Sequence, residues 1–484
     1  MRTIEKVALF SLLSLLLFIS CVGPAYVRPK TEVPPAFKEI EGWKTAEPRD
    51  NELRGPWWTM FGDTLLDSLE TRAAVSNQTV AIARAQYDQA RAAIRASRAG
   101  YFPTLGAQAS GTRAQRSATL GQSGVSVGGA GATASDFLLS GDVSWEPDIW
   151  GKVRRLTEAN TAGAQASAAD LGSVGLSVQA QLAQSYFQIR ILDEQKRILD
   201  SAAADFQTFL DLTTNRYKSG VASRGDVLQA QTQLRSTQAQ SLDVGVSRSQ
   251  LEHAVAVLIG KPASVFSIAP APLSASVPAI PLGLPSALLE RRPDVAAAEQ
   301  RVAAANAQIG AAEAAYFPNI TLGATGGFES GLISKLFTLP SEMWSLGATA
   351  AGTIFDGGLR GAQVDQAKAA YAASVAAYRQ TVLTAFQEVE DNVSGLRILE
   401  NEAQVQDEAV SASRKSLGLA INQYKQGTIS ALDVVTTQSV ELNNHKAAVV
   451  ILGNRLSSAV LLIKALGGGW DASQLPTSKK TGLN

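Results

Sequence analysis

Few residues of this chain could carry out chemistry of their own. Its 484 residues contain one cysteine, two histidines and three methionines. A disulfide framework is therefore excluded, and a Cys/His metal centre is not expected. His253 and His445 stand in different halves, without the neighbours of a nucleophilic triad, and no G-x-x-x-x-G-K-[ST] phosphate loop occurs. The sequence predicts no enzymatic activity, no metal and no cofactor.

The single cysteine has a chemical role of another kind. Arg2 and Lys6 precede an apolar run at 7–19, the order of an export signal. Thirteen helical residues reach only about 20 Å, short of the roughly 30 Å hydrocarbon core, so a retained transmembrane helix is not expected. Ser20 and Cys21 end this run in a pattern similar to a bacterial lipobox, whose cysteine receives acyl chains. Cys21 is the predicted lipid-attachment residue, with palmitate-type chains as the only covalent group.

The chain contains an internal repeat, which determines how the other motifs are interpreted. Residues 215–227 recur as residues 422–434, with Asn, Tyr, Lys, Gly, Ser, Asp and Val in common, 207 positions later. Tyr101-Phe102-Pro103 recurs as Tyr316-Phe317-Pro318 at an offset of 215. The extra residues lie between these markers, where the first copy has a Gly/Ser-rich run at 121–135.

Each copy of the longer motif combines signals for the end of one helix and the start of the next. A glycine suits the left-handed residue that ends a helix, and Ser-x-x-Asp is a capping box. The residues are Gly220, Ser223 and Asp226 in the first copy, and Gly427, Ser430 and Asp433 in the second. Both halves are predicted to form a helical hairpin with a carboxylate at its tip.

Short strands and very long helices must position these tips. Four segments alternate apolar and polar residues, each about as long as a tilted transmembrane strand: 104–112, 137–146, 320–328 and 344–354. Helices are predicted at 64–100, 151–213, 223–258, 286–314, 358–421 and 430–466. The two longest would reach roughly 95 Å. Each is expected to pair with its return helix below and with the preceding helix above, stacked end to end. Six of the 18 prolines make 260–285 an irregular connector.

Hydrogen bonding then predicts an oligomer. Four strands cannot close a barrel, and an open sheet edge in lipid leaves backbone groups unpaired. Two copies would give 8 strands and three would give 12, and this argument does not choose between them. Because 43 basic side chains balance 43 acidic ones, no field exists that would attract nucleic acid.

Several motifs, in order, make the chain similar to the TolC-like outer membrane efflux family, in its lipoprotein branch. They are CVGPAYVRP at 21–29, WW at 57–58, FGD at 61–63, SWEPDIWGKVRR at 144–155, GLPSALLERRPDV at 283–295 and IFDGG at 354–358. The resemblance covers nearly all of the chain after the signal.

This resemblance implies an α+β membrane protein. Three chains would share a 12-stranded β-barrel in the outer membrane, continued by a 12-helix periplasmic α-barrel with a mixed equatorial region. The expected segments are a signal peptide (1–20), a lipidated N-terminal segment (21–63), two repeats (64–259 and 286–466), the connector (260–285) and a tail (467–484).

The resemblance also implies a function and partners. The chain would be the exit channel of a tripartite efflux system for small molecules such as drugs. It would work with a periplasmic adaptor, or membrane fusion protein, and an inner-membrane pump of the RND type or similar. Metal efflux and type I protein secretion use the same kind of channel and remain alternatives. A non-conducting periplasmic lipoprotein scaffold is a further one, but it has no need of four two-faced strands.

In the family, the repeated tips form the periplasmic entrance. Acidic residues ring its axis, and Tyr and polar side chains tether neighbouring hairpins. Asp226, Tyr424 and Asp433 stand at matching positions and are the implied gate residues. Ile429 stands where some members carry a tethering Arg, and Thr436 where some carry a second acidic ring, so this gate is expected to be held differently.

Overall fold

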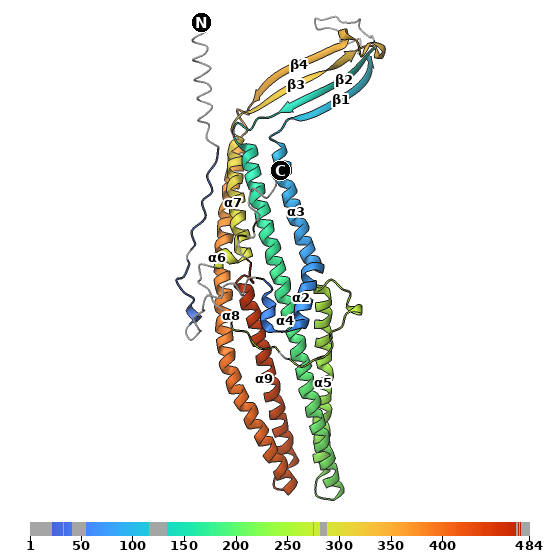
Figure 1. The fold of residues 1–484 in the computed structure, drawn as a ribbon, viewed down its shortest axis with the longest axis vertical. Helices are drawn as coiled ribbons and strands as arrows, with labels where there is room; N and C mark the ends of the chain where they lie inside the picture. The colour runs from blue at the N-terminus through green and yellow to red at the C-terminus, as the bar shows by residue number, and fades with distance from the viewer. Residues whose placement is uncertain are drawn as a thin grey trace.

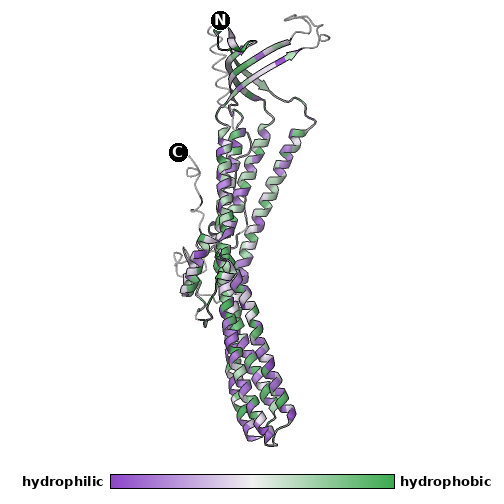
Figure 2. Cartoon of the chain, turned by 90° about the vertical axis from the view of Figure 1, so that its right-hand side faces the viewer, coloured by the Kyte–Doolittle hydropathy of each residue, from purple (hydrophilic) through white to green (hydrophobic). Residues whose placement is uncertain are grey.

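The protein is elongated, with a β-sheet at one end and helices running from the base of the sheet to two tips at the other (Figure 1). The computed structural model describes residues 22–31, 33–40, 55–115, 133–273, 275–280 and 288–470, with residues 473 and 475. The helices form a narrow body below the sheet (Figure 2). The predicted signal peptide, Cys21 and most of the Gly/Ser-rich run lie outside the described residues.

Four antiparallel strands form one sheet in the order β1-β2-β3-β4. Their bounds are β1 Thr104–Gln115, β2 Thr133–Trp145, β3 Asn319–Ser330 and β4 Glu342–Ala351. The four strand predictions are confirmed, with one difference at the last strand. β4 ends at Ala351, so Ile354, predicted to lie in it, follows the strand and is fully exposed. The chain turns there toward Gly357 and Gly358, whose positive φ angles suit the start of the next helix.

Two long helices connect the sheet to the tips, as predicted. They are α4 (Lys152–Lys218, 67 residues) and α8 (Leu359–Gln426, 68 residues), about 100 Å each. α5 (Arg224–Leu258) and α9 (Ala431–Ala465) pack along their lower parts, and α3 (Gln78–Ala99) and α7 (Pro293–Ala314) pack along their upper parts. The predicted end-to-end stacking of shorter helices against each long helix is therefore present in both halves.

The predicted helix at 64–100 is two helices, α2 (Thr64–Ser76) and α3, separated by Asn77. The backbone of Asn77 is extended, and its Oδ1 accepts a hydrogen bond from Val80 N at 3.0 Å. Its Nδ2 donates to Leu258 O, on the last residue of α5, at 2.8 Å. A competing side-chain cap of this kind ends one helix and starts the next. Asn77, at the break, thus links the start of α3 to the end of α5.

The second half makes the same junction with a different residue. The predicted helix at 286–314 is likewise two helices: α6 (Leu288–Arg291) ends before Arg292, and α7 starts at Pro293, a residue that suits the first turn of a helix. The buried Arg292 guanidinium donates to Ala465 O, on the last residue of α9, at 3.1 Å. It also pairs with Asp294 at 2.6 Å and Glu388 at 2.7 Å.

A close backbone contact accompanies each junction. Gly260 has φ +67°, and a Cβ there would lie 2.3 Å from Ser76 O. Gly467 has φ +95°, and a Cβ there would lie 2.1 Å from Arg291 O. Both conditions require glycine. The two glycines are separated by the 207 positions that relate the repeated motifs.

The main hydrophobic core lies at the level of these junctions. It includes Trp57, Phe61 and Phe187, together with residues of α2, α4, α7, α8 and α9. Between α5 and α6, the described parts of the connector run across this region and include η4 (Ala263–Val265). The charged groups that bind its backbone are on the helices: Arg248 donates to Ile268 O at 2.6 Å, and Arg190 donates to Ala269 O at 2.8 Å.

One acidic residue in this region has no compensating partner. Glu70 of α2 is 0% exposed, and neither of its carboxylate oxygens has a hydrogen-bond partner among the described residues. Burial, with a smaller contribution from the negative charge of Asp67, raises the pKa of the Glu70 carboxyl to about 9. Glu70 is therefore protonated in the folded protein at neutral pH.

We predict that Glu70 makes the protein less stable as pH rises. The folded state retains this proton up to about pH 9, whereas the unfolded state releases it near the ordinary value of 4.5. Stability should then fall between these pH values by at most about 1.4 kcal/mol per pH unit. Glu70→Gln should remove this component and raise the melting temperature at pH 8 but not at pH 4. The exposed Glu402→Gln is the control, and an equal pH dependence in wild type and Glu70→Gln would contradict the prediction.

Candidate functional site

The two helical tips are built from the repeated motif. α4 ends at Lys218, and Gly220 follows with φ +74°. α8 ends at Gln426, and Gly427 follows with φ +81°. Both glycines take the left-handed conformation that terminates a helix and turns the chain back.

A complete capping box starts each return helix. Ser223 Oγ accepts from Asp226 N at 3.1 Å, and Asp226 Oδ2 accepts from Ser223 N at 2.9 Å. In the second tip, Asp433 Oδ2 accepts from both Ser430 N at 2.9 Å and Ser430 Oγ at 2.7 Å. These bonds satisfy backbone donors that would otherwise be unpaired at the start of a helix.

The carboxylate of Asp433 is nevertheless open to solvent. The hydrogen bonds from Ser430 lower the pKa of the Asp433 carboxyl below its usual value. Asp433 therefore remains ionised at neutral pH while it caps α9. Its capping role and its negative charge are properties of the same group, and they can be separated only by substitution.

Tyr424, the third implied gate residue, is buried between the two hairpins. Its ring lies 5.2 Å from the ring of Phe209, and its hydroxyl is 3.3 Å from the hydroxyl of Thr213. Among the described residues, its hydrogen-bond and ring partners across the hairpins lie on α4, and Asp226 is not one of them. The residue therefore joins the tip of α8 to α4 within one chain.

Arg216 makes a charged contact between the two tips, and the sequence interpretation missed it. Its Nη1 donates to Tyr424 O at 2.8 Å and approaches Lys425 O at 3.4 Å. Its guanidinium lies 4.7 Å from the centre of the Tyr424 ring. The second copy of the repeat has Gln423 at this position. That difference between two otherwise similar motifs was the available signal.

The two departures from the family pattern have clear surroundings. Ile429 packs against a small apolar cluster at the tips that includes Phe209, Tyr424 and Val434. Thr436 is exposed on α9. In some family members an Arg at the position of Ile429 is implied to tether neighbouring hairpins. In this chain Ile429 packs in an apolar cluster instead, and Arg216 makes the charged contact between the tips.

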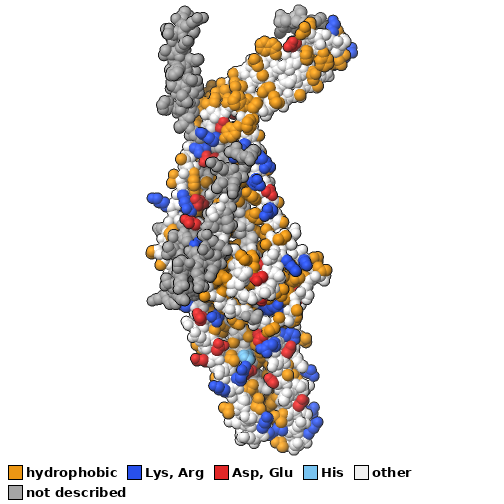
Figure 3. Space-filling view, in the orientation of Figure 1, with side chains coloured by type: hydrophobic (Ala, Val, Ile, Leu, Met, Phe, Trp, Pro, Cys, Tyr) orange, Lys and Arg blue, Asp and Glu red, His pale blue; other side chains and the backbone are white. Residues whose placement is uncertain are grey.

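The other functional surface is the sheet, whose two faces differ in chemistry. The register places apolar side chains on one face: Leu105, Ala107, Phe137, Leu139, Val143, Trp145, Leu322, Ala324, Phe328, Trp344, Leu346 and Ala348. The other face carries Gln108, Ser110, Ser140, Asp142, Ser144, Thr321, Thr325, Ser345 and Thr349. In the space-filling view, the visible part of the sheet has few charged side chains compared with the helical body (Figure 3).

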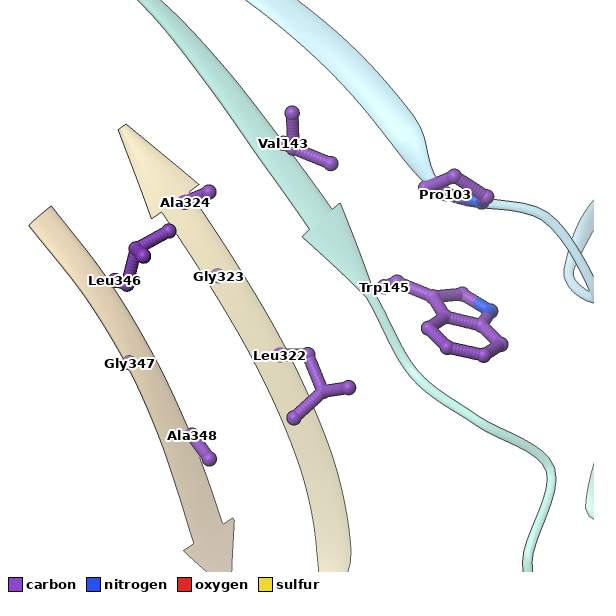
Figure 4. Close-up of a pocket in the computed structure, with 9 residues that line it drawn as sticks. All are labelled: Pro103, Val143, Trp145, Leu322, Gly323, Ala324, Leu346, Gly347 and Ala348. Atoms are coloured by element: carbon purple, nitrogen blue, oxygen red, sulfur yellow. The ribbon is translucent and has the colours of Figure 1, made fainter. Parts of the chain in front are cut away.

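The apolar face is open to its surroundings. Most of its side chains are exposed, including Trp344 and Leu346. A shallow hollow of about 560 Å³ lies on this face between adjacent strands and is lined by Val143, Trp145, Leu322 and Leu346, among others (Figure 4). A sheet with one apolar and one polar exposed face fits between lipid and water.

Metal-binding and catalytic groupings are not found among the described residues. No cluster of three or more His, Cys, Asp or Glu side chains there could hold a metal ion. His445 lies 3.0 Å from Arg414 and 3.5 Å from Glu441 on a helix surface.

Comparison with known proteins identifies the family. A family model described as outer membrane efflux protein matches residues 69–261 and 284–468. The chain belongs to the outer membrane efflux protein family. This is a family of outer-membrane channels and not of enzymes, which confirms the predicted class and localisation.

Relatives of this efflux protein match over nearly their whole length. Two are each 31% identical to it: the pyoverdine export outer membrane protein OpmQ of Pseudomonas aeruginosa and the probable efflux pump outer membrane protein TtgC of Pseudomonas putida. The matches cover 88% of this chain and 89% of OpmQ, and 95% of this chain and 96% of TtgC. The solved outer-membrane channel OprN is 27% identical, with a TM-score of 0.86 over 93% of this chain and 99% of OprN.

We predict that Arg216 holds the two tips of this efflux protein together. A hydrogen bond from a charged group contributes about 1.5–3 kcal/mol. Arg216→Gln should therefore speed amide exchange in peptides covering residues 415–430 by about tenfold or more. Hydrogen exchange with mass spectrometry measures this effect. Arg235→Gln, which removes an exposed arginine of α5 bonded to Gln238, is the matched control. Equal exchange in all three proteins would contradict the assignment.

Proposed function

We propose that this protein is the outer-membrane exit channel of a tripartite efflux system for small molecules. The observation that carries the proposal is the direct continuation of a two-faced sheet into two helices about 100 Å long. The sheet suits the membrane, and the helices suit a passage through the periplasm. A non-conducting scaffold would leave the exposed apolar face of the sheet unexplained.

The edges of the sheet support a trimer. β1 and β4 are the edge strands, and neither has a neighbour on its outer side in the part of the chain that the structure describes. Since the four strands alternate in direction, β4 of one copy can pair antiparallel with β1 of the next. Three copies would close a barrel of 12 strands and surround a passage with 12 helices at each level, four from each chain. Closure satisfies the edge hydrogen bonds that lipid cannot.

We predict that the purified protein is a trimer. Native mass spectrometry in detergent distinguishes two, three and four copies by mass. A trimer as the dominant species is expected because the strand edges need partners. A dominant monomer or dimer in a detergent that preserves channel activity would refute the 12-stranded arrangement.

The described N-terminal segment supports lipid attachment at Cys21. Buried Arg155, near the upper end of α4, donates to Val22 O at 3.0 Å and Gly23 O at 2.9 Å. Asn306 of α7 donates to Pro24 O at 3.0 Å. The residues that follow Cys21 are thus bound close to the end of the sheet that meets the helices. This position suits a lipid anchor in the membrane leaflet on the helical side of the sheet. A lipidated N-terminus together with a barrel makes attachment effectively permanent.

We predict that the mature chain begins at an acylated Cys21. Chains released from the complex in a mass spectrometer should be heavier than residues 21–484 by the mass of the acyl groups. Cys21→Ser should lose this mass difference because the sulfur that accepts the lipid is gone. Unmodified wild-type chains, or acyl groups retained in Cys21→Ser, would show that the cysteine is not the attachment site.

The partners and the segment boundaries are part of the same proposal. The periplasmic tips would meet an adaptor protein, and an inner-membrane pump of the RND type or similar would supply the substrate. Relatives named for pyoverdine export and for an efflux pump support small-molecule cargo. We also propose the repeat boundaries 64–259 and 286–466 and the connector 260–285, supported by the recurring order of helix, hairpin, long helix, tip and return helix.

The tips are the proposed periplasmic gate. Threefold symmetry would bring three copies of Asp226 and three of Asp433 around one axis. Convergent carboxylates attract multivalent cations more strongly than monovalent ones. Tyr424 and Arg216 would hold the hairpins of each chain together. The charged ring and the tether are then made by different residues.

We predict that Asp433→Ala raises single-channel conductance and weakens block by divalent or trivalent cations in planar bilayers. Asp433→Asn separates the two roles because its amide oxygen can still accept from Ser430 but carries no charge. If charge forms the block, both variants lose it. Wild-type conductance and block in Asp433→Asn, in a trimeric protein, would leave Asp433 with a capping role only.

A further inference from the structure

The connection between β3 and β4 has an unusual distribution of apolar side chains. It comprises residues 331–341, with two short turns, η6 (Ile333–Lys335) and η7 (Leu339–Ser341). Four of its large apolar side chains are exposed: Leu332 55%, Ile333 68%, Phe337 70% and Leu339 84%. Only Leu336 is buried among its large apolar residues. A water-exposed loop would not be expected to expose so much apolar surface.

Several polar groups of this loop form hydrogen bonds with one another, and Ser341 is buried. Lys335 O accepts hydrogen bonds from Thr338 N at 3.2 Å, Thr338 Oγ1 at 2.7 Å and Ser341 Oγ at 2.8 Å. Ser341 N donates to Thr338 O at 2.9 Å. The loop therefore satisfies these backbone and hydroxyl groups internally while its apolar side chains face outward. This is the arrangement that a nonpolar environment requires.

The loop is continuous with the apolar face of the sheet. The ring of Phe337 lies 5.6 Å from the ring of Phe328, in an edge-to-face arrangement. Phe328 belongs to the apolar face, opposite Leu139 of β2. The loop lies at the end of the sheet farthest from the helices (Figure 1). In the proposed channel this end reaches the outer leaflet.

We infer that residues 331–341 form a lipid-binding loop that inserts into the outer leaflet of the membrane around the barrel. Phe337 and Leu339 enter the boundary between acyl chains and headgroups, next to the band formed by Phe328. Lys335 is the only charged residue of the loop, and a lysine at this level suits lipid phosphates. The inference rests on the proposed function, because it requires the sheet to span the membrane.

Spin labels on single introduced cysteines test this inference in the full-length trimer. The only native cysteine is Cys21, so labelling of the unsubstituted protein measures the background. Leu339→Cys is the test position. Leu346→Cys, on the apolar face of β4, is the lipid reference, and Thr349→Cys, on the polar face of the same strand, is the water reference. The proteins are placed in vesicles of phosphatidylethanolamine and phosphatidylglycerol.

Collision with oxygen reports lipid exposure, and collision with a water-soluble nickel complex reports water exposure. The label at Leu339 should shift toward oxygen and away from nickel, as at Leu346 and opposite to Thr349. High nickel access at Leu339 would overturn the inference, as would low access to both reagents, which would place the loop in a protein contact. In both of those cases, lipid exposure of the label at Leu346 would still support the proposed membrane-spanning sheet. Water exposure at Leu346 itself would instead refute the membrane-spanning sheet.

Discussion

The fold depends on a change of partner halfway along each long helix. α4 and α8 are each about twice as long as any helix that packs on them, so each needs two shorter helices stacked end to end. The stack leaves helix-end carbonyls inside the core, where an unpaired carbonyl is costly. In the first half Asn77 donates to Leu258 O, and in the second Arg292 donates to Ala465 O. Each upper helix thus caps the return helix beneath it through the residue that precedes its own first turn.

This shared junction explains what the sequence could and could not predict. Strands, long helices and tips follow from local patterns, and the repeat offset marks equivalent positions. The contacts at the junction do not follow from local patterns, because Asn77 and Leu258 are 181 residues apart. In the sequence, a capping residue such as Asn77 also cannot be distinguished from any other polar residue of a predicted helix. Arg216 was missed for the same reason, since its acceptor on Tyr424 is 208 residues away. Periodicity predicts elements, whereas contacts between elements depend on tertiary packing.

Charged side chains of both signs have a structural role beside the connector. Inside the core, Arg190 and Arg248 share Asp193 at 3.1 and 2.6 Å, and Arg248 pairs with Glu252 at 3.0 Å. These groups also bond the backbone of the connector, where Glu252 accepts from Ile268 N at 2.5 Å. An irregular segment has no ladder or helix to satisfy its own backbone groups. Buried charged side chains of both signs make these backbone hydrogen bonds instead. Removal of one partner would leave an uncompensated charge in the core.

The two repeats are similar at the junctions but differ at the tips, and the difference separates two properties of the proposed gate. Asp226 and Asp433 each serve as a cap within their own hairpin, so neither carboxylate needs to contact the other hairpin. Contacts between the hairpins are made by the Tyr424 side chain and by Arg216, which has Gln423 as its counterpart in the second copy. In the proposed gate, the capping carboxylates and the Arg216 contact can therefore be altered by separate substitutions.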